Sequence, residues 1–135
     1  MTPEPVGREE GGSKENSFVV HEHRARHLHY DLRMERGGVL RSWAVPKGVP
    51  ETAGERHLAV QTEDHPLEYL TFEGTIPEGE YGAGTEAIWD TGTYETIAWG
   101  DGKIEVVFHG SRLSGRYVLV RFRRAGGKDW LIFKK

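Results

Sequence analysis

From Phe18 onward, short apolar runs alternate with polar residues and are separated by turn-forming residues. A spacing of two between apolar positions is typical of β-strands, because successive side chains of a strand point to opposite faces. Glycine pairs between the runs, and the stretch Asp90-Thr91-Gly92, indicate turns. Residues 66–72 could form at most a short turn. The pattern predicts strands over Phe18–His23, Leu28–Glu35, Leu40–Val45, Arg56–Thr62, Thr85–Trp89, Gly92–Thr96, Lys103–His109, Arg116–Arg123 and Trp130–Lys134.

The regular spacing of these strands favours an all-β fold. We expect a single compact antiparallel β-barrel of about eight strands with little helix, closed so that no strand edge stays exposed. Residues 1–17 are polar, rich in glycine and proline, and without periodicity. The sequence therefore predicts a polar N-terminal arm over residues 1–17 and a barrel domain over residues 18–135.

The composition narrows the chemistry. The chain has 135 residues and no cysteine, which excludes a disulfide scaffold, thiolate metal ligands and a cysteine nucleophile. No apolar run approaches the roughly 20 residues of a membrane helix, so we expect a cytoplasmic protein. The net charge of -3 is unevenly distributed, with an acidic middle third and a basic C-terminal third over residues 101–135. Because field strength is local, a basic face can still hold phosphates.

One predicted strand, residues 28–35, carries the candidate chemistry. Its odd-numbered face is ionisable and includes His29, Asp31 and Arg33, while the other face is apolar. His29 and Asp31 lie about 7 Å apart along the strand, so both can reach one ion, and His23 on the preceding strand can supply a third ligand. Two histidines and a carboxylate suit Mn, Fe or Zn with open coordination positions, and Arg33 could hold a phosphate oxygen. The competing interpretation is a solvated polar face.

A second group of polar residues follows the predicted strand that ends at Thr62. His65 opens a loop whose backbone is fixed by Pro66. It could contact a scissile phosphate or protonate a leaving oxygen, with Tyr69 as a neighbouring donor and Glu63 orienting the imidazole. Taken alone, this pattern is equally typical of an ordinary loop histidine.

Other conspicuous features receive no catalytic role at this point. The glycine-rich segment 74–84 lacks the Lys-Ser/Thr of a phosphate-binding P-loop, and we interpret it as a tightly folded structural loop. His21 and His27 complete the cluster of histidines near the N-terminus, and both are expected to be bystanders.

Two alternative functions stay open on these residues. The His-x-Asp pair, with a distal His109 and a downstream Arg121, is also compatible with an Fe(II) facial-triad oxygenase. A non-catalytic nucleic-acid-binding barrel that uses the basic C-terminal third is the other alternative.

Several short stretches, in a fixed order along nearly the whole chain, carry a resemblance to a known family. They are Phe18-Val19-Val20 running into His23, Leu28-His29-Tyr30-Asp31-Leu32-Arg33, Ser42-Trp43-Ala44-Val45-Pro46-Lys47-Gly48, Leu58-Ala59-Val60-Gln61, Glu63-Asp64-His65-Pro66, Phe72-Glu73-Gly74-Thr75-Ile76-Pro77, Tyr81-Gly82-Ala83-Gly84, Leu113-Ser114-Gly115-Arg116 and Trp130-Leu131-Ile132. With these stretches the chain resembles the 3'-phosphoesterase domain of bacterial DNA ligase D and its free-standing bacterial and archaeal relatives.

The resemblance implies a β-barrel hydrolase that depends on Mn²⁺, or on another divalent transition metal such as Zn²⁺ or Co²⁺. It implies a phosphodiesterase step, which removes a 3'-terminal ribonucleoside and leaves a 3'-phosphate, and a phosphomonoesterase step, which removes that phosphate. The implied substrates are primer–template DNA 3' ends before non-homologous end joining. The implied partners are a separate DNA ligase, a polymerase and Ku, with no membrane partner.

The resemblance also assigns site residues by position. No serine or cysteine lies in an obvious nucleophile setting, so we expect direct attack by water. The metal ligands implied are His23, His29 and Asp31, the contacts to the scissile phosphate are Arg33 and His65, and the supporting residue is Tyr69.

Four further positions are implied as accessory. Lys47 and Glu63 match accessory active-site positions, and Glu4 matches an N-terminal carboxylate implicated in the phosphatase step. Some relatives carry an accessory arginine where this chain has His57, and Arg56 lies one residue earlier. Arg56 is therefore a candidate substrate-binding residue, although a shift of one residue on a strand changes the face.

Overall fold

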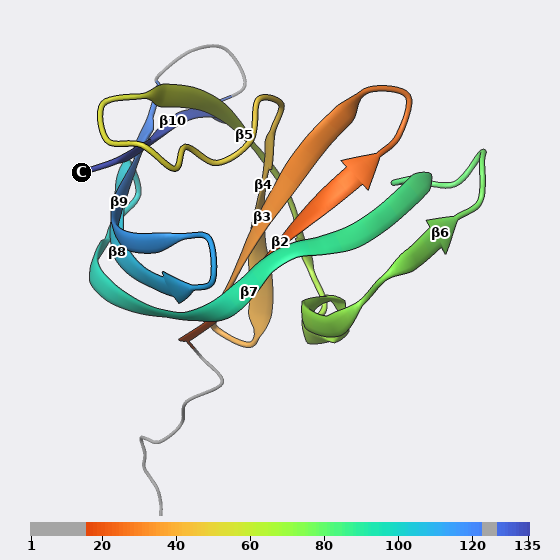
Figure 1. The fold of residues 1–135 in the computed structure, drawn as a ribbon, viewed down its shortest axis with the longest axis horizontal. Coiled ribbons are helices and arrows are strands. Elements are labelled where there is room, and N and C mark those ends of the chain that lie inside the picture. The colour runs from red at the N-terminus through yellow and green to blue at the C-terminus, as the bar shows by residue number, and fades with distance from the viewer. Residues whose placement is uncertain (1–15, 123–126) are drawn as a thin grey trace, which may run out of the picture.

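The fold comes from a computed structural model, which describes residues 16–122 and 127–135 (Figure 1). Antiparallel strands dominate these described residues, and the helical content is one short 3₁₀ segment. The elements are β2 (Ser17–Arg24), β3 (Leu28–Arg36), β4 (Val39–Val45), β5 (Arg56–His65), η2 (Leu67–Thr71), β6 (Gly74–Ile76), β7 (Gly84–Trp99), β8 (Lys103–Gly110), β9 (Ser114–Arg121) and β10 (Asp129–Lys134). Within the described ranges, no helix is long and apolar enough to cross a membrane.

The strands close into a barrel. They follow the order β2-β3-β4-β5-β10-β9-β8-β7, and β7 pairs back with β2 to complete the ring. The short β6 pairs with β7 outside this ring. The prediction of an all-β antiparallel barrel of about eight strands with little helix is therefore confirmed.

The prediction of two strands separated by a turn at Asp90-Thr91-Gly92 is wrong, because β7 runs without interruption through these residues. Asp90 is only 4% exposed, and its carboxylate accepts hydrogen bonds from the backbone N–H groups of Thr91, Ser111, Arg112 and Leu113. The aspartate thus caps the β8–β9 connection from a neighbouring strand. Aspartate is common in turns, but here its carboxylate binds the backbone of a turn about 20 residues later in the sequence.

The remaining boundaries differ in smaller ways. The segment 74–84, expected as a loop, contains β6 at its start, and residues 67–71 form the expected single helical turn, η2. β5 continues to His65, so this histidine ends a strand and does not open a loop. The predicted N-terminal arm lies outside the described residues except for its last two, and Ser17 already belongs to β2. Arg123, the predicted end of another strand, also lies outside them.

The barrel interior and the candidate site lie on opposite faces of the same strands. On β3, Leu32 and Met34 are fully buried in the core, as are Phe18 and Val20 on β2. The intervening residues point to the other face, where η2 and the segment that leads to β7 cover them (Figure 1). The competing interpretation of a solvated polar face is therefore wrong, since Arg33 on this face is only 2% exposed. Because side chains alternate between the two faces of a strand, packing of the core residues also fixes the positions of the site residues on the opposite face.

We expect Asp90→Asn to destabilise the barrel. The substitution replaces one carboxylate oxygen by an amide NH₂ that faces backbone N–H donors, so buried donors lose their acceptor. The free energy of unfolding, measured by urea denaturation, should fall by about 1–3 kcal/mol. Glu95→Gln, which changes an exposed carboxylate on the same strand, is the control and should change stability little. An unchanged urea midpoint for Asp90→Asn would show that this cap contributes nothing.

Candidate metal and phosphate site

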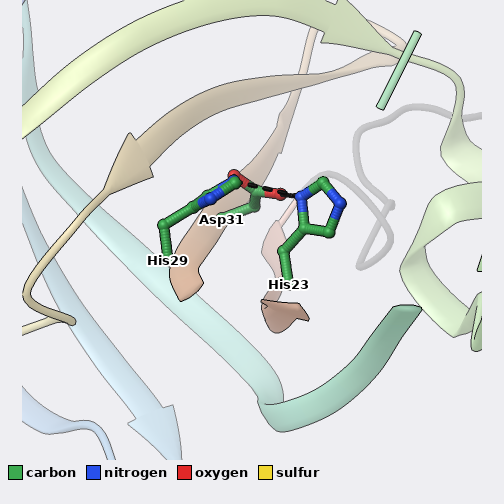
Figure 2. A group of neighbouring side chains, drawn as sticks. All are labelled: His23, His29 and Asp31. Atoms are coloured by element: carbon green, nitrogen blue, oxygen red, sulfur yellow. Dashed lines mark hydrogen bonds and ion pairs between the residues drawn. The ribbon is translucent and has the colours of Figure 1, made fainter. Parts of the chain in front are cut away.

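Neighbouring strands place three potential metal ligands side by side. In the β2–β3 register His23 lies opposite His29, and Asp31 is two residues farther along β3 on the same face. Nδ1 of His23 lies 3.0 Å from Nε2 of His29 and 3.3 Å from Oδ2 of Asp31, and Nε2 of His29 lies 3.2 Å from Oδ1 of Asp31. Figure 2 shows the three side chains pointing toward one another. The predicted triad is thus brought together.

Backbone carbonyls fix the tautomers of both histidines. Nε2 of His23 lies 3.1 Å from the carbonyl oxygens of Gly82 and Ala83, and Nδ1 of His29 lies 3.3 Å from that of His27. A carbonyl only accepts, so these nitrogens carry the hydrogens, and in the neutral rings the opposite nitrogens keep lone pairs. Both lone pairs point at Asp31. Two imidazole lone pairs and a carboxylate that converge repel one another unless a cation lies between them. These three groups form a possible ligand set for a metal ion, and the backbone carbonyls orient the two rings.

The pKa values of His29 and Asp31 indicate that positive charge is favoured between these two residues. The hydrogen bond to Asp31 raises the pKa of His29 despite the opposing effect of burial. Burial by itself raises the pKa of Asp31, but the hydrogen bond from His29 and the charge of Arg33 outweigh it, so the pKa is lowered. A proton on His29 therefore takes the place that a cation would occupy.

The triad opens into a cavity of about 190 Å³. The charged residues that line this cavity are Asp31, Glu86 and Arg33, so with neutral histidines the formal charge without a cation is -1. A divalent cation brings it to +1, which suits a phosphate ester. The full lining is His23, His29, Asp31, Arg33, Ala44, Thr62, His65, Tyr81, Gly82 and Glu86.

Arg33 occupies the centre of the site, and its guanidinium is held on every side. The contact atoms are His21 Nδ1 at 3.2 Å from Nε, Ser42 Oγ and His65 Nδ1 at 3.2 and 3.1 Å from Nη1, and Asp31 Oδ2 and Glu86 Oε1 at 3.2 and 3.4 Å from Nη2. A buried charge is tolerated only when it is paired and hydrogen-bonded. Two carboxylates and neutral acceptors meet that requirement here.

His65 reaches the site through an irregularity in β5. Thr62 lies opposite Ser42 of β4, but His65 lies opposite Leu40, so one extra residue is inserted between these pairs. Such a bulge changes which side chain faces a given side. It brings His65 beside Arg33, and the ring centroid of Tyr69 lies 4.8 Å from that of His65 and 5.3 Å from the Arg33 guanidinium carbon.

One nitrogen of His65, Nδ1, lies between a donor and an acceptor. Nδ1 lies 3.1 Å from Nη1 of Arg33, which donates, and 3.0 Å from the carbonyl oxygen of Glu63, which accepts. The ring satisfies one partner at a time in its neutral form. Burial and the charge of Arg33 lower the pKa of His65. His65 is therefore neutral at neutral pH, and Nε2 is a donor when Nδ1 accepts from Arg33.

The structure does not bring the accessory residues into these contacts. Lys47 is exposed in the turn after β4, and the Glu63 side chain is exposed while its carbonyl contacts His65. Arg56 lies at the opposite end of β5 from His65, about 30 Å along an extended strand, and stacks on Phe133. Glu4 lies outside the described residues.

The residues of the oxygenase alternative lie elsewhere. His109 is exposed near the end of β8 and pairs with Glu95 at 2.7 Å. Arg121 ends β9 and contacts Asp101. Neither lines the cavity that holds His29 and Asp31.

Sequence reasoning missed two site residues. His21, expected to be a bystander, is fully buried, accepts from Arg33 and donates from Nε2 to the carbonyl of Phe72 at 2.9 Å. Burial and Arg33 lower its pKa, which agrees with a neutral ring. The two-residue spacing from His23 placed it on the same face and could have identified it. Glu86 on β7 had no such signal, because its proximity depends on the β2–β7 pairing.

Comparisons with known proteins identify the family of this chain. The family model of the DNA ligase D 3'-phosphoesterase domain matches residues 21–121. The chain belongs to this family. It is 53% identical over 96% of its length to the multifunctional non-homologous end joining protein LigD of Mycobacterium bovis, and 41% identical over 99% of its length to that of Pseudomonas aeruginosa. The predicted family resemblance is confirmed.

The relatives are much longer than this chain. The aligned part covers 17% of both the Mycobacterium bovis and the Pseudomonas aeruginosa LigD proteins. This chain therefore spans about a sixth of the length of these relatives.

We expect the imidazole of His65 to titrate below the ordinary histidine pKa of 6.5. In the metal-free protein, NMR titration of the His65 ring should show a midpoint below this value, because burial and Arg33 both disfavour the imidazolium. Replacement of Arg33 by Met removes the cation and leaves Asp31 and Glu86, so the midpoint should rise. His109 is the internal reference. If the His65 midpoint stays unchanged in Arg33→Met, Arg33 does not control this ring.

Proposed function

We propose that this chain is a metal-dependent phosphoesterase that heals DNA 3' ends. It removes a 3'-terminal ribonucleoside to leave a 3'-phosphate, and then removes the phosphate. The observation that carries the proposal is the convergence of His23, His29 and Asp31 beside the buried Arg33. This arrangement joins a cation site to an anion site in one cavity, which is what hydrolysis of a phosphate ester requires. Membership of the phosphoesterase family supports it.

The metal site is proposed to hold Mn²⁺, and its donors also accept Zn²⁺ or Co²⁺. When bound, a divalent ion polarises a phosphate oxygen and lowers the pKa of a coordinated water. The chain contributes both imidazole lone pairs and the Asp31 carboxylate, with Gly82, Ala83 and His27 holding the rings through their carbonyls.

Arg33 and His65 are proposed to bind the phosphate. All three guanidinium nitrogens of Arg33 have protein partners. The hydrogen bond from Nη1 to His65 is the one that a phosphate oxygen can replace at least cost. When it is replaced, Nδ1 of His65 donates to the Glu63 carbonyl instead. The anionic phosphate favours uptake of one proton from solvent at Nε2 of His65, and the resulting imidazolium gives this Nε2 proton to the leaving oxygen. Tyr69 packs against both residues and keeps their orientation.

The biological setting is proposed from the relatives. Their names place them in non-homologous end joining, and the name of a Mycobacterium tuberculosis relative that is 53% identical adds DNA repair. The substrate class proposed for this chain is accordingly a primer–template DNA 3' end, with a ligase, a polymerase and Ku as partners in the same pathway. Lys47, Glu63, Glu4 and Arg56 stay candidate accessory residues for these substrates.

We expect one high-affinity Mn²⁺ site per chain. Electron paramagnetic resonance of free Mn²⁺ should show stoichiometric loss of signal on addition of the protein, and His23→Ala or Asp31→Ala should weaken binding by more than about tenfold, since even outer partners of a ligand contribute 10–100-fold. The control is His27→Ala, because only the His27 backbone contacts the triad. Equal affinity in wild type and both ligand variants would refute the assignment.

We expect metal-dependent shortening of a labelled primer–template that ends in one ribonucleotide. With Mn²⁺, gel electrophoresis should show a product one nucleoside shorter, bearing a 3'-phosphate. His29→Ala and Asp31→Ala should lower the rate by more than about 100-fold through loss of a metal ligand, while His109→Ala should keep it. Near-normal rates in either ligand variant, or turnover in the presence of a chelator, would contradict the proposed function.

A further inference from the structure

Tyr81 combines two properties that rarely occur in one side chain. It lines the cavity of the metal triad, yet 72% of its surface is exposed. The other large exposed apolar residues in the described part of the chain are aliphatic, namely Leu28, Leu58 and Ile97. An aromatic ring held in water beside a polar cavity gains no stability from burial. Its position beside the cavity is suited to contact with a bound ligand.

The backbone beside Tyr81 is anchored to a metal-ligand candidate. The carbonyls of Gly82 and Ala83 accept from Nε2 of His23, at 3.1 Å each. Gly84 has a φ of +124°, and a side chain there would collide with the backbone carbonyl of Arg24 at the end of β2. The amide of Ala83 also donates to the carbonyl of Glu80 at 3.1 Å. The backbone that carries the Tyr81 side chain is therefore held at a defined place relative to the triad.

The size of the cavity shows where a substrate base must lie. Pockets that enclose whole small ligands have volumes of about 300–1,000 Å³, whereas this one has about 190 Å³. It has room for the phosphate beside Arg33, but the rest of a nucleotide extends past the rim. Tyr81 forms part of that rim.

We propose that Tyr81 is the stacking platform for the base of the nucleoside at the scissile phosphate, so that the rim forms a nucleobase subsite. This inference rests on the proposed phosphoesterase function and adds a specificity-determining residue to it. Every base has an aromatic face, so stacking holds a terminal nucleoside without reading its identity. An end-healing enzyme needs such tolerance, because the base at a broken end varies.

Stacking can be observed directly without turnover. An oligonucleotide whose 3'-terminal ribonucleoside carries 2-aminopurine is added to metal-free protein, and its fluorescence is recorded. Wild type, Tyr81→Phe and Tyr81→Trp should quench the fluorescence, whereas Tyr81→Ala should leave it largely unquenched. Binding of each variant is checked by the anisotropy of a distant label. Equal quenching by Tyr81→Ala, at matched saturation, would overturn the proposal.

Kinetics then separate a stacking role from a structural one. With Mn²⁺ and a 3'-ribonucleotide primer–template, Tyr81→Ala should lower kcat/KM by roughly tenfold, the size of one lost base–aromatic stack. With an abasic 3'-terminal ribose, wild type and Tyr81→Ala should have the same kcat/KM. Ile97→Ala, an exposed residue of β7 away from the cavity, should match wild type on both substrates.

The outcomes distinguish this inference from the proposed function. If wild type cleaves neither substrate, the phosphoesterase proposal fails. If wild type cleaves both and Tyr81→Ala is equally impaired on both, the residue supports the fold or the metal ligands and the nucleobase subsite is refuted. We expect Tyr81→Ala to lose activity on the base-bearing substrate only. Tyr81→Phe should retain activity on both substrates.

Discussion

The guanidinium of Arg33 is the constraint on which the arrangement of this site depends. It carries a full charge at a position with almost no solvent contact, which is costly unless every donor finds an acceptor and the charge is compensated. Asp31 and Glu86 supply the compensation, and Ser42 and the rings of His21 and His65 accept the remaining hydrogen bonds. One cation thereby fixes residues from five strands. Burial and the charge of Arg33 together lower the pKa values of these two histidines and favour their neutral forms.

The barrel makes this arrangement possible by using both faces of the same strands. Along β3, core residues alternate with site residues, so Leu32 and Met34 in the interior set the height and spacing of Asp31 and Arg33 outside. A register slip of one residue would exchange the two sets, and the hydrophobic interior opposes such a slip. The precision of the ligand geometry therefore comes from packing on the far side of the sheet.

The same alternation explains which parts of the molecule could be predicted from sequence. The all-β class and the triad of His23, His29 and Asp31 follow from local period-two patterns, and they are present as predicted. Glu86 depends on the pairing of β7 with β2, and the place of His65 depends on a bulge between Thr62 and that residue. Pairing partners and inserted residues are set by tertiary packing, and no local pattern encodes them.

Charge at the site shows why the overall net charge of -3 says little about substrate. The acidic middle of the sequence contributes to the cavity lining one carboxylate, Glu86, which joins Asp31 against Arg33. With neutral histidines the side chains carry a net negative charge that repels a phosphodiester and attracts a divalent cation, and a cation bound at the proposed site would reverse the sign. Metal and phosphate affinities would then be coupled through the same two carboxylates. A second arginine in place of Glu86 would attract phosphate directly, but it would weaken the proposed cation site.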